Sequence, residues 1–465
     1  MQLSNQNKFQ LLILVIIDIF LVALAFYIAF IFRFNSNIPS ENFQAFINIL
    51  PWILLFTILV FYMFDLYTDW KRRSVHNLFY SLILSLIIVN LLCIVASFIF
   101  REFAFPRSVL IISFVMQLLL ILGYRSVYYW ISKSIHGIKK VIIVGKEFEN
   151  TDLLVDKFHH HSPGWFKVKG YIYFEELTSG FLENKPLNFD AVLINNDLLE
   201  DQKSSIVSIC AKHGIETLIL PNLYELFITN AKTQQIDDMP VMSISPPKLN
   251  SNQMFIKRFF DIIISLGLII ILSPIIFLLV ILIPLTSRGP ALYKQERLGL
   301  YGKPFNIYKF RSMVVDAEKD SGPVLASESD PRITSIGKII RLTRLDELPQ
   351  LFNVLKGDMS IVGPRPERAY FVEQFNKEVE NYSYRMTVKP GITGLAQVLS
   401  KYSTTVEDKL RYDLMYVNSY SFALDIKIML QTIRVILTPE QANGVKEKNA
   451  EDKKIKVLSK IIGTK

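Results

Sequence analysis

Residues 341–368 read RLTRLDELPQLFNVLKGDMSIVGPRPER, and this stretch is the most informative part of the chain. Two adjacent carboxylates, Asp346 and Glu347, stand at the predicted start of an amphipathic helix. Two acids among arginines suit a reaction on a phosphate group with a metal ion present. The arginines that flank the pair in sequence are Arg341, Arg344, Arg365 and Arg368.

The Asp-Glu pair has two interpretations. Aspartate is a preferred helix N-cap, glutamate suits the first turn and Pro349 is tolerated there, so DELP is consistent with a helix start alone. A carboxylate also attacks phosphorus to give an acyl phosphate, and Mg²⁺ needs only one or two protein carboxylates beside phosphate oxygens and water. On this second interpretation Asp346 is the nucleophile, Glu347 binds Mg²⁺, and the arginines keep Asp346 ionised.

Basic residues interleaved with aromatic residues precede the pair, in GPALYKQERLGLYGKPFNIYKFRSM at positions 289–313. Within it, FNIYKF predicts a strand. This pattern suits a nucleotide base and its diphosphate, and it also suits a basic surface against a membrane; the two interpretations are compatible. The basic residues of the segment are Lys294, Arg297, Lys303, Lys309 and Arg311.

Further candidates follow the pair. Arg365 lies between Pro364 and Pro366, whose rigid backbone favours a fixed anion contact. Lys389 belongs to the turn-rich segment VKPGITGLAQV, which predicts a loop able to close over a site. The segment from Arg411, RYDLMYVNSYSFALDIKIMLQTI, predicts an amphipathic helix and its continuation, lying along a membrane.

Four apolar runs open the chain, and each has about the ~20 residues that a helix needs to cross a bilayer. The first run is too long, and too closely followed by others, for a cleaved signal peptide. Hydrophobic residues make up 51% of the chain, and its mean hydropathy is +0.31. The runs are Leu11–Ile31, Ile47–Leu66, Leu78–Phe100 and Val109–Trp130.

Flanking charge predicts the orientation of these runs. Clusters of Lys and Arg follow the second and fourth runs, including Lys71–Arg73 and Lys139–Lys140, whereas the other two turns carry mixed charges. By the positive-inside rule, both ends of the four-helix unit face the cytoplasm. The net charge of +9 suits anionic partners, such as a membrane surface or nucleotide phosphates. Cys93 and Cys210 imply no disulfide framework, which fits a reducing compartment.

A fifth apolar run extends from Phe259 to Leu285. Hydropathy alone predicts a fifth span, but Asp261 is expensive in lipid without a partner, and Ser273-Pro274 interrupts the helix near its middle. Basic residues lie on both sides of the run, with Lys257 and Arg258 before it. A helix that enters the membrane, bends and returns is therefore favoured over a full span, with Ser273 satisfying freed backbone groups.

Residues 139–245 alternate strand and helix patterns, which predicts a small parallel Rossmann-like sheet. KKVIIVG is followed by GKEFEN and lacks the G-x-G-x-x-G fingerprint, so this domain is expected to be structural or regulatory. The run His159–His161 is expected to be a solvated loop, because consecutive residues rarely converge on one metal ion. The Pro- and Ser-rich segment from Asp237 to Asn252 predicts a linker.

At these motifs the chain resembles the bacterial polyprenyl-phosphate hexose-1-phosphate transferases of the large monotopic type. The resemblance covers about 254–439, and the N-terminal helices and the α/β domain also resemble the long members of that family. The segments that carry it are KRFFD with the later Ser-Pro, GPALYKQERLG, YKFRSM, DELPQLFNVLKGDMSIVGPRPE and KPGITGLAQV.

The resemblance implies a reaction. A sugar-1-phosphate moves from a UDP-sugar to undecaprenyl phosphate with release of UMP, as the first membrane step of exopolysaccharide, capsule or O-antigen synthesis. It implies that Asp346 carries the phosphosugar and that Glu347 helps to hold Mg²⁺. The implied substrate- and phosphate-binding residues are Arg365, Arg311, Lys309, Arg297, Lys294, Arg344, Lys389 and Gln350. The re-entrant helix features fall on Lys257, Arg258, Asp261, Ser273 and Pro274.

The expected architecture is a membrane α plus α/β protein of the bacterial inner membrane, with its catalytic domain in the cytoplasm. The resemblance also implies a homodimer, with membrane lipids as partners, and no nucleic acid is expected. The expected parts are four transmembrane helices (1–135), a Rossmann-like domain (139–245), a linker and re-entrant helix (246–288), an α-rich α/β monotopic catalytic domain (289–440) and a Lys-rich tail (441–465).

Two other functions remain as alternatives, a non-catalytic scaffold for polysaccharide assembly and a membrane nucleotide-sugar dehydratase. The intact DELPQ and PRP segments argue against the scaffold. The middle domain has no Tyr-x-x-x-Lys pair and no dinucleotide fingerprint, which argues against the dehydratase. The sugar is not readable from the sequence. Glucose is the first expectation, followed by galactose or an N-acetylated amino sugar.

Overall fold

The computed structural model of the chain describes residues 5–35, 37–67, 75–136, 138–146, 166–177, 189–229, 231–244, 249–315, 317, 330–400 and 404–437. The chain forms two compact units, one over residues 1–220 and one over 221–452. The clusters His159–His161 and Lys71–Arg73 and the Lys-rich tail lie outside the described residues. The second unit begins at Pro221 and so includes residues 221–244, which the sequence analysis counted with the α/β domain.

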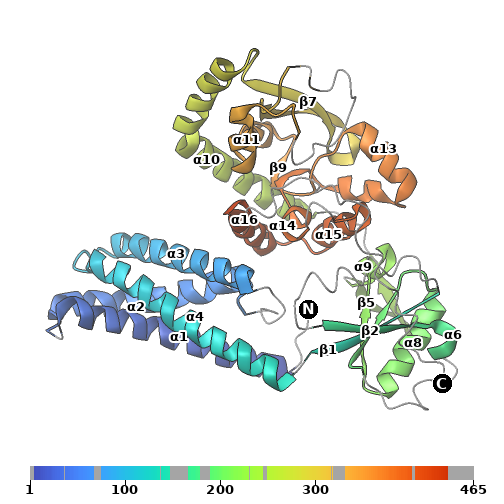
Figure 1. The fold of residues 1–465 in the computed structure, drawn as a ribbon, viewed down its shortest axis with the longest axis horizontal. Coiled ribbons are helices and arrows are strands. Elements are labelled where there is room, and N and C mark those ends of the chain that lie inside the picture. The colour runs from blue at the N-terminus through green and yellow to red at the C-terminus, as the bar shows by residue number, and fades with distance from the viewer. Residues whose placement is uncertain are drawn as a thin grey trace. The chain divides into compact units, whose positions relative to one another are not determined.

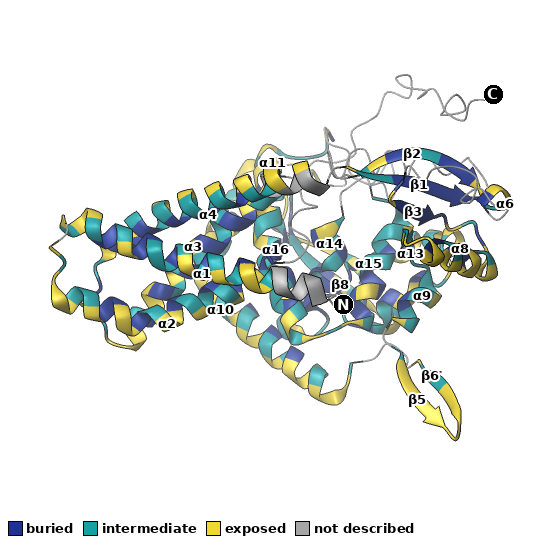
Figure 2. Cartoon of the chain, turned by 90° about the horizontal axis from the view of Figure 1, so that it is seen from below, coloured by how far each residue is buried: buried dark blue, intermediate teal, exposed yellow. Residues whose placement is uncertain are grey.

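Four long helices open the first unit, and each contains one of the predicted apolar runs. Their apolar side chains pack inward, as with Phe26 and Phe61, and also face outward, as with Phe20 and Ile111. Figure 2 shows exposed positions along the outer sides of these helices. Such outward apolar faces suit lipid contact. The helices are α1 (Asn5–Phe34), α2 (Ser40–Met63), α3 (Val75–Ile99) and α4 (Arg107–His136).

A buried ion pair fixes two of these helices to each other. Arg125 of α4 donates to the carboxylate of Asp18 of α1 at 2.6 Å, and both side chains are fully buried. The same guanidinium donates to the carbonyl oxygen of Leu66, which follows α2, at 2.8 Å. Charged groups within apolar helices need such partners, and this pair supplies them across helices that are distant in sequence.

The rest of the first unit is a four-stranded parallel sheet in the order β2-β1-β3-β4 (Figure 1). The predicted Rossmann-like pattern is confirmed: the two central strands, β1 and β3, are buried apolar runs, and helix α8 has the amphipathic period. Val144, Ile194 and Ile206 belong to its buried core. The elements are β1 (Lys139–Gly145), β2 (Phe166–Tyr173), α6 (Phe174–Glu176), β3 (Ala191–Ile194), α8 (Glu200–Lys212) and β4 (Glu216–Ile219).

The second unit begins with helix α9 (Leu223–Ile228) and an antiparallel hairpin, β5 (Lys232–Ile236) with β6 (Met239–Ser243). The interpretation of residues 237–252 as a linker is therefore wrong at its start. Asp237 adopts a positive φ of 54° in the hairpin turn, and Pro240 stands within a two-stranded ribbon, where proline is tolerated.

Helix α10 (Ser251–Thr286) contains the fifth apolar run and two prolines, Pro274 and Pro284. It is one helix rather than two, and Figure 1 shows it changing direction near its middle. Pro274 cannot donate to the carbonyl oxygen of Ile270, and the Ser273 hydroxyl donates to that oxygen instead, at 2.8 Å. The prediction that Ser273 satisfies a freed backbone group is confirmed. The predicted interruption at Ser273-Pro274 is a bend in one continuous helix.

Both halves of α10 are anchored in the second unit. In the first half, Asp261 accepts hydrogen bonds from the Ser360 hydroxyl and the Ile361 amide, both at 3.0 Å, so it has the partners that it needs. In the second half, Leu279 and Ile283 are buried against Ala291, Phe310 and Ile340. Between these anchors most side chains are apolar and several are exposed, including Ile270 and Ile271 at 64% and 71% exposure, although Ser265 is buried.

The remaining elements form the body of the second unit, around a core that includes Ile307, Val354, Val362 and Tyr416. They pair as a β7–β8 antiparallel hairpin and a short parallel β9–β10 pair. The elements are β7 (Leu292–Leu298), η3 (Leu300–Gly302), β8 (Pro304–Phe310), α11 (Ser335–Leu342), η4 (Leu345–Glu347), α12 (Gln350–Lys356), β9 (Ser360–Val362), α13 (Ala369–Glu378), η5 (Tyr382–Thr387), β10 (Gly391–Thr393), α14 (Leu395–Leu399), α15 (Val406–Asn418) and α16 (Phe422–Leu437).

Helix α15 is not a membrane-surface helix of the kind predicted from its amphipathic pattern. Its apolar residues Leu410, Leu414, Tyr416 and Val417 are all buried, at 5% exposure or less. They contribute to the two cores of the second unit. An amphipathic period alone does not distinguish a face that packs on protein from one that packs on lipid.

Candidate active site

The Asp-Glu pair lies in a single 3₁₀ turn, η4, between α11 and α12. Glu347 is buried, and its Oε1 accepts from Arg365 Nη2 at 2.8 Å and from Lys309 Nζ at 3.2 Å. Lys309 comes from β8, and Arg365 comes from the loop after β9. Three segments that are distant in sequence therefore meet at the Glu347 carboxylate. With the adjacent Asp346, four of the predicted site residues lie together: Lys309, Asp346, Glu347 and Arg365.

Two cations keep Glu347 charged. Burial alone would raise the pKa of Glu347, but the Arg365 guanidinium and the Lys309 ammonium outweigh burial and hold that pKa well below its usual range. Conversely, Glu347 raises the pKa of Arg365. Glu347 is buried, whereas the Arg365 side chain is 38% exposed, so the three groups form a cluster of net positive charge that solvent reaches, which suits a phosphate ligand.

Asp346 caps no helix. The N-cap residue is Arg344 for η4 and Pro349 for α12, and neither helix start has a side-chain capping bond. Asp346 Oδ1 is buried and has no hydrogen-bond partner among the described atoms. The expected position at a helix start is therefore confirmed, and the N-cap role that the sequence suggested for Asp346 is wrong. A buried acceptor without a partner is costly, and such groups mark functional positions.

The electrostatic environment of Asp346 differs from the sequence expectation. Burial and the neighbouring Glu347 charge raise the pKa of Asp346 to about 6, even though Lys309 and Arg344 act in the opposite direction. Arg344 and Arg341 lower the pKa of Asp346, as the sequence predicted, but burial and the Glu347 charge outweigh them. A carboxylate with a raised pKa remains mostly ionised at neutral pH and is a stronger nucleophile than a free one.

Arg344 sets the direction of the turn. Its φ of 57° places it in the left-handed region, which is unfavourable for a residue with a Cβ. Its side chain is exposed, and its charge lowers the pKa of both Asp346 and Glu347. Arg341 lies on α11 just upstream and lowers the pKa of Asp346 as well.

The other predicted ligands make contacts of their own. Lys294 lies over the ring of Tyr308, 5.7 Å from its centroid. Arg297 donates to the Gln295 side chain, to the Pro366 carbonyl oxygen and to the Glu367 carboxylate. These contacts put Lys294 on the β7–β8 hairpin surface and Arg297 behind the Pro364–Glu367 segment, not in the Glu347 cluster.

Arg311, Lys389 and Gln350 occupy different places. The Arg311 guanidinium donates to the carbonyl oxygens of Ser287 and Arg288 at 2.7 and 2.6 Å, and so caps the end of α10. Burial lowers the pKa of Lys389, whose ammonium is close to Arg258. Gln350 is buried at the start of α12, and its Nε2 has no partner among the described atoms.

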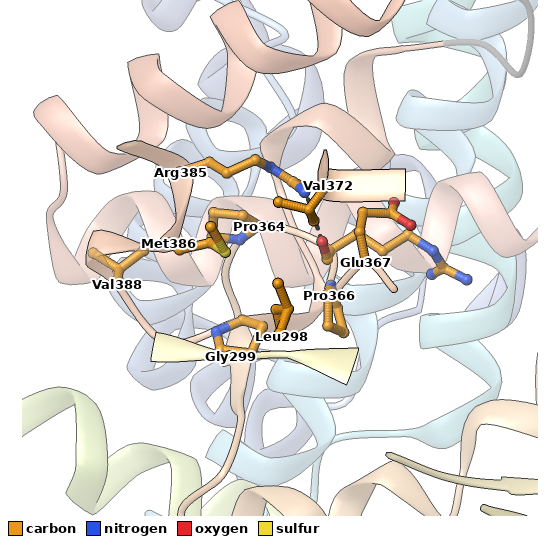
Figure 3. Close-up of a pocket in the computed structure, with 11 residues that line it drawn as sticks. Leu298, Gly299, Pro364, Pro366, Glu367, Val372, Arg385, Met386 and Val388 are labelled. Atoms are coloured by element: carbon orange, nitrogen blue, oxygen red, sulfur yellow. Dashed lines mark hydrogen bonds between the residues drawn. The ribbon is translucent and has the colours of Figure 1, made fainter. Parts of the chain in front are cut away.

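The loop that carries Arg365 packs closely on the KPGITG loop. A Cβ on Gly363 would lie 2.4 Å from the carbonyl oxygen of Lys389, so the two backbones approach as only glycine allows. The loop also borders a small pocket, shown in Figure 3, whose lining includes Pro364, Arg365 and Arg385.

Sequence reasoning missed a buried ion pair beside this loop. Arg385 of η5 pairs with Asp413 of α15 at 2.7 Å, with both side chains buried, and it also donates to the Arg365 carbonyl oxygen at 2.9 Å. The only sequence signal is a charged residue within the apolar pattern of each segment. That signal does not identify a partner 28 residues away.

The cluster fits a divalent cation in its chemistry. No group of three or more His, Cys, Asp and Glu side chains gathers as metal ligands within the described parts of the chain. Mg²⁺ does not need such a group, because it is held by one or two carboxylates together with substrate oxygens and water. Glu347 is a carboxylate of this kind, and Asp346 stands next to it with a buried oxygen that has no partner among the described atoms.

Comparison with known proteins agrees with this site. Residues 252–439 match the bacterial sugar transferase family. The UDP-glucose:undecaprenyl-phosphate glucose-1-phosphate transferase of Escherichia coli (strain K12) is 31% identical over 317 residues, which are 64% of this chain and 68% of that relative. The chain belongs to the bacterial sugar transferase family. The expected family membership is confirmed, and the Glu347 cluster lies within the matched residues.

Two other relatives of this bacterial sugar transferase act on different sugars by name. The UDP-N-acetylgalactosamine-undecaprenyl-phosphate N-acetylgalactosaminephosphotransferase of Aeromonas hydrophila is 38% identical over 54% of this chain and 60% of its own length. The UDP-glucose:undecaprenyl-phosphate glucose-1-phosphate transferase of Klebsiella pneumoniae is 41% identical over 46% of this chain and 47% of its own length. The chain therefore matches about half the length of these two relatives.

Residues 62–161 of this bacterial sugar transferase match a CoA-binding domain, a range that includes α3, α4 and β1. The described residues at the carboxyl end of β1 do not suit an anionic ligand. The Asp197 carboxylate accepts from the Lys146 amide at 2.7 Å, at the edge where doubly wound sheets bind phosphate groups. A Cβ on Gly145 would lie within 3.0 Å of both Tyr171 and Asp197. We assign no bound cofactor to this domain.

Proposed function

We propose that the chain transfers a sugar-1-phosphate from a UDP-sugar to undecaprenyl phosphate and releases UMP. The observation that carries this proposal is the contrast between two adjacent carboxylates. Glu347 is held by Lys309 and Arg365, whereas Asp346 has a buried oxygen with no partner among the described atoms. Relatives named as undecaprenyl-phosphate sugar phosphotransferases support the substrate class.

In the first step, an oxygen of Asp346 attacks the phosphorus that carries the sugar. The bond from this phosphorus to the bridging diphosphate oxygen breaks, and UMP leaves with the electron pair. The product is an aspartyl phosphosugar. Asp346 Oδ1 accepts no hydrogen bond among the described atoms. No hydrogen bond to this oxygen therefore has to break before it attacks phosphorus.

In the second step, a phosphate oxygen of undecaprenyl phosphate attacks the same phosphorus. The bond from phosphorus to the Asp346 oxygen breaks, which restores the carboxylate and gives an undecaprenyl-diphosphate sugar. Both steps expel an anion, so the cations around Glu347 stabilise charge in each transition state. No external base is needed, because both nucleophiles are already ionised.

The side chains of the cluster have separate roles in this proposal. Arg365 and Lys309 contact the transferring phosphoryl group and the leaving phosphate, and Arg344 and Arg341 add positive charge at the open side of the turn. Glu347 is the residue that would hold Mg²⁺, which leaves Asp346 as the nucleophile. A bound Mg²⁺ supplies charge neutralisation on the phosphate oxygens.

We also propose that α10 is re-entrant and that α1–α4 cross the inner membrane, with the α/β sheet of the first unit and the body of the second unit in the cytoplasm. Five described helices are long and apolar enough to cross a bilayer, α10 among them. Both halves of α10 contact the same unit, and its exposed apolar residues surround the bend. The part beyond Pro274 rises only about 20 Å, which is too short to cross ~30 Å of hydrocarbon.

Labelling of introduced cysteines tests this topology. In a chain with Cys93 and Cys210 replaced by alanine, Ser251→Cys and Arg288→Cys place thiols at the two ends of α10. Both are expected to resist an impermeant maleimide in intact cells and to react in inverted vesicles. Phe103→Cys, between α3 and α4, is the control that should react in intact cells. Reaction of Arg288→Cys from outside only would contradict the re-entrant helix.

The activity itself is tested by UMP release. Purified protein in detergent or nanodiscs with Mg²⁺ is expected to release UMP from one of UDP-glucose, UDP-galactose or UDP-N-acetylgalactosamine over many turnovers only when undecaprenyl phosphate is added. Without the lipid, it is expected to release no more than one UMP per chain. The same assay excludes a scaffold, which would release none. Multiple-turnover UMP release independent of the lipid phosphate would contradict transfer. The homodimer and the polysaccharide pathway remain predictions from the family resemblance.

A further inference from the structure

The Pro364–Glu367 segment is held in the second unit by its carbonyl oxygens. Two of its four residues are prolines without an N–H, so the segment cannot be fixed by a regular ladder of backbone hydrogen bonds. Instead, each of its carbonyl oxygens accepts a hydrogen bond from elsewhere in the unit. The pairs are Pro364 with the Gly391 amide at 2.9 Å, Arg365 with Arg385 Nη2 at 2.9 Å, Pro366 with Arg297 Nη1 at 3.3 Å, and Glu367 with the Leu298 amide at 2.9 Å.

The bond to the Arg365 carbonyl oxygen differs from the others because its donor is a buried, paired cation. Arg385 donates through Nε to Asp413 Oδ2 at 2.8 Å and through Nη1 to the Tyr382 hydroxyl at 2.9 Å. The Arg385 and Asp413 side chains are 7% and 3% exposed. Figure 3 shows the Arg385 side chain extending toward the Pro364–Glu367 segment.

Every nitrogen of this guanidinium has a partner. Nε and Nη2 contact Asp413, Nη1 donates to Tyr382, and Nη2 also donates to the Arg365 carbonyl oxygen. Because Asp413 neutralises Arg385, the contact adds little net charge beside Glu347. The pair therefore orients the loop and leaves the charge of the site to Lys309 and Arg365.

We propose that Arg385 and Asp413 are positioning residues for the transfer reaction. By holding the Arg365 carbonyl oxygen, they fix the peptide plane from which the Arg365 side chain extends to Glu347. Without that bond, rotation about the Arg365 backbone moves its guanidinium away from Glu347 and from a substrate phosphate. The proposal rests on the proposed function, since it concerns how the same site binds its nucleotide sugar.

Asp413→Asn tests this role, because it keeps the size of the side chain and removes the charge that orients Arg385. We expect the KM for the UDP-sugar to rise about tenfold and kcat to fall about tenfold or more, as for a displaced phosphate contact. A residue with a structural role only would lower kcat with the folded fraction and leave KM unchanged. An unchanged KM in folded Asp413→Asn protein would overturn the proposal.

Asp425→Asn is the matched control. Asp425 forms an equally buried pair with Lys257 at 2.7 Å in the same unit, but it does not contact the Pro364–Glu367 segment. The Asp425→Asn protein is expected to lose about as much thermal stability as the Asp413→Asn protein. Its KM for the UDP-sugar is expected to stay within about threefold of wild type. If the control shifts KM as much as Asp413→Asn does, the effect is general destabilisation and the proposal fails.

A conservative variant covers the case in which Asp413→Asn does not fold. Arg385→Lys keeps a cation for Asp413, but its single ammonium lacks the fork that also reaches the Arg365 carbonyl oxygen. The same rise in KM is expected, and an unchanged KM would overturn the proposal.

Hydrogen exchange separates this proposal from the proposed function. Faster exchange is expected in peptides covering 361–372 in Asp413→Asn protein and not in Asp425→Asn protein, whether or not the protein is active. Wild-type protein that releases no UMP would count against the proposed function, while unchanged exchange in Asp413→Asn would count against positioning.

Discussion

Asp346→Asn is expected to lower UMP release by about 10³-fold or more, because an amide nitrogen does not attack phosphorus. The covalent adduct is expected to disappear with it. Wild-type protein incubated with a radiolabelled UDP-sugar and no lipid acceptor should retain label after denaturation, whereas the variant should not. Asp358→Asn, which changes an outlying carboxylate paired with Lys356 at 3.9 Å, is the control and should keep activity within about twofold.

The same substitution has a second readout in stability. The pKa of Asp346 is raised from its ordinary value of 3.8 to about 6, so protonated Asp346 favours the folded state. That contribution is fully present below about pH 4 and is lost as the pH rises through about 6. At neutral pH the asparagine variant is therefore expected to melt no lower than wild type. Substantial activity in this folded variant would sink the aspartyl mechanism.

Glu347→Gln is expected to lower UMP release by about 10²-fold or more, for two separate reasons. The side-chain amide of the introduced glutamine is a poor Mg²⁺ ligand. Because this amide is neutral, the Lys309 and Arg365 cations also lose their countercharge. Loss of the buried countercharge is expected to cost about 2 kcal/mol of folding stability, measured by chemical denaturation. Initial rates measured against Mg²⁺ concentration should show a raised requirement for the metal ion.

Glu407→Gln is the control for this variant, because Glu407 is a largely exposed partner of Arg411 on α15. It should change neither the Mg²⁺ requirement nor the rate by more than about twofold. A Glu347→Gln protein with an unaltered Mg²⁺ requirement would remove Glu347 as a metal ligand, even if its activity were low.

Local sequence patterns predicted those features that depend on local chemistry. The strand β1 follows from KKVIIVG, the bend in α10 follows from Ser273-Pro274, and the Asp346–Glu347 turn follows from DELP. Each is encoded within a few residues, because side-chain branching, a missing N–H or a rigid ring acts on the adjacent backbone. The roles of the site residues remain predictions.

Long-range contacts were not predictable in the same way. Arg297, Arg311 and Arg365 are all arginines near aromatic or proline residues, yet they bind a loop, a helix end and a carboxylate respectively. The raised pKa of Asp346 depends on its burial and on the Glu347 charge, and the folded chain sets both. The ion pair of Asp413 was not predictable for the same reason, because its partner Arg385 lies on another element, η5.

The two anchors of α10 relate sequence spacing to depth in the membrane. At 1.5 Å per residue, the helix rises by about 20 Å from Asp261 to Pro274 and by about 14 Å from Pro274 to Ile283. Half of a bilayer's hydrocarbon is about 15 Å thick. In the proposed re-entrant arrangement, a helix anchored at both ends does not shift along the membrane normal by itself, so the number of residues on either side of Pro274 would set the height of Asp346 above the acyl chains. Insertion of a single helical turn in either half would move the reacting carboxylate relative to the lipid phosphates.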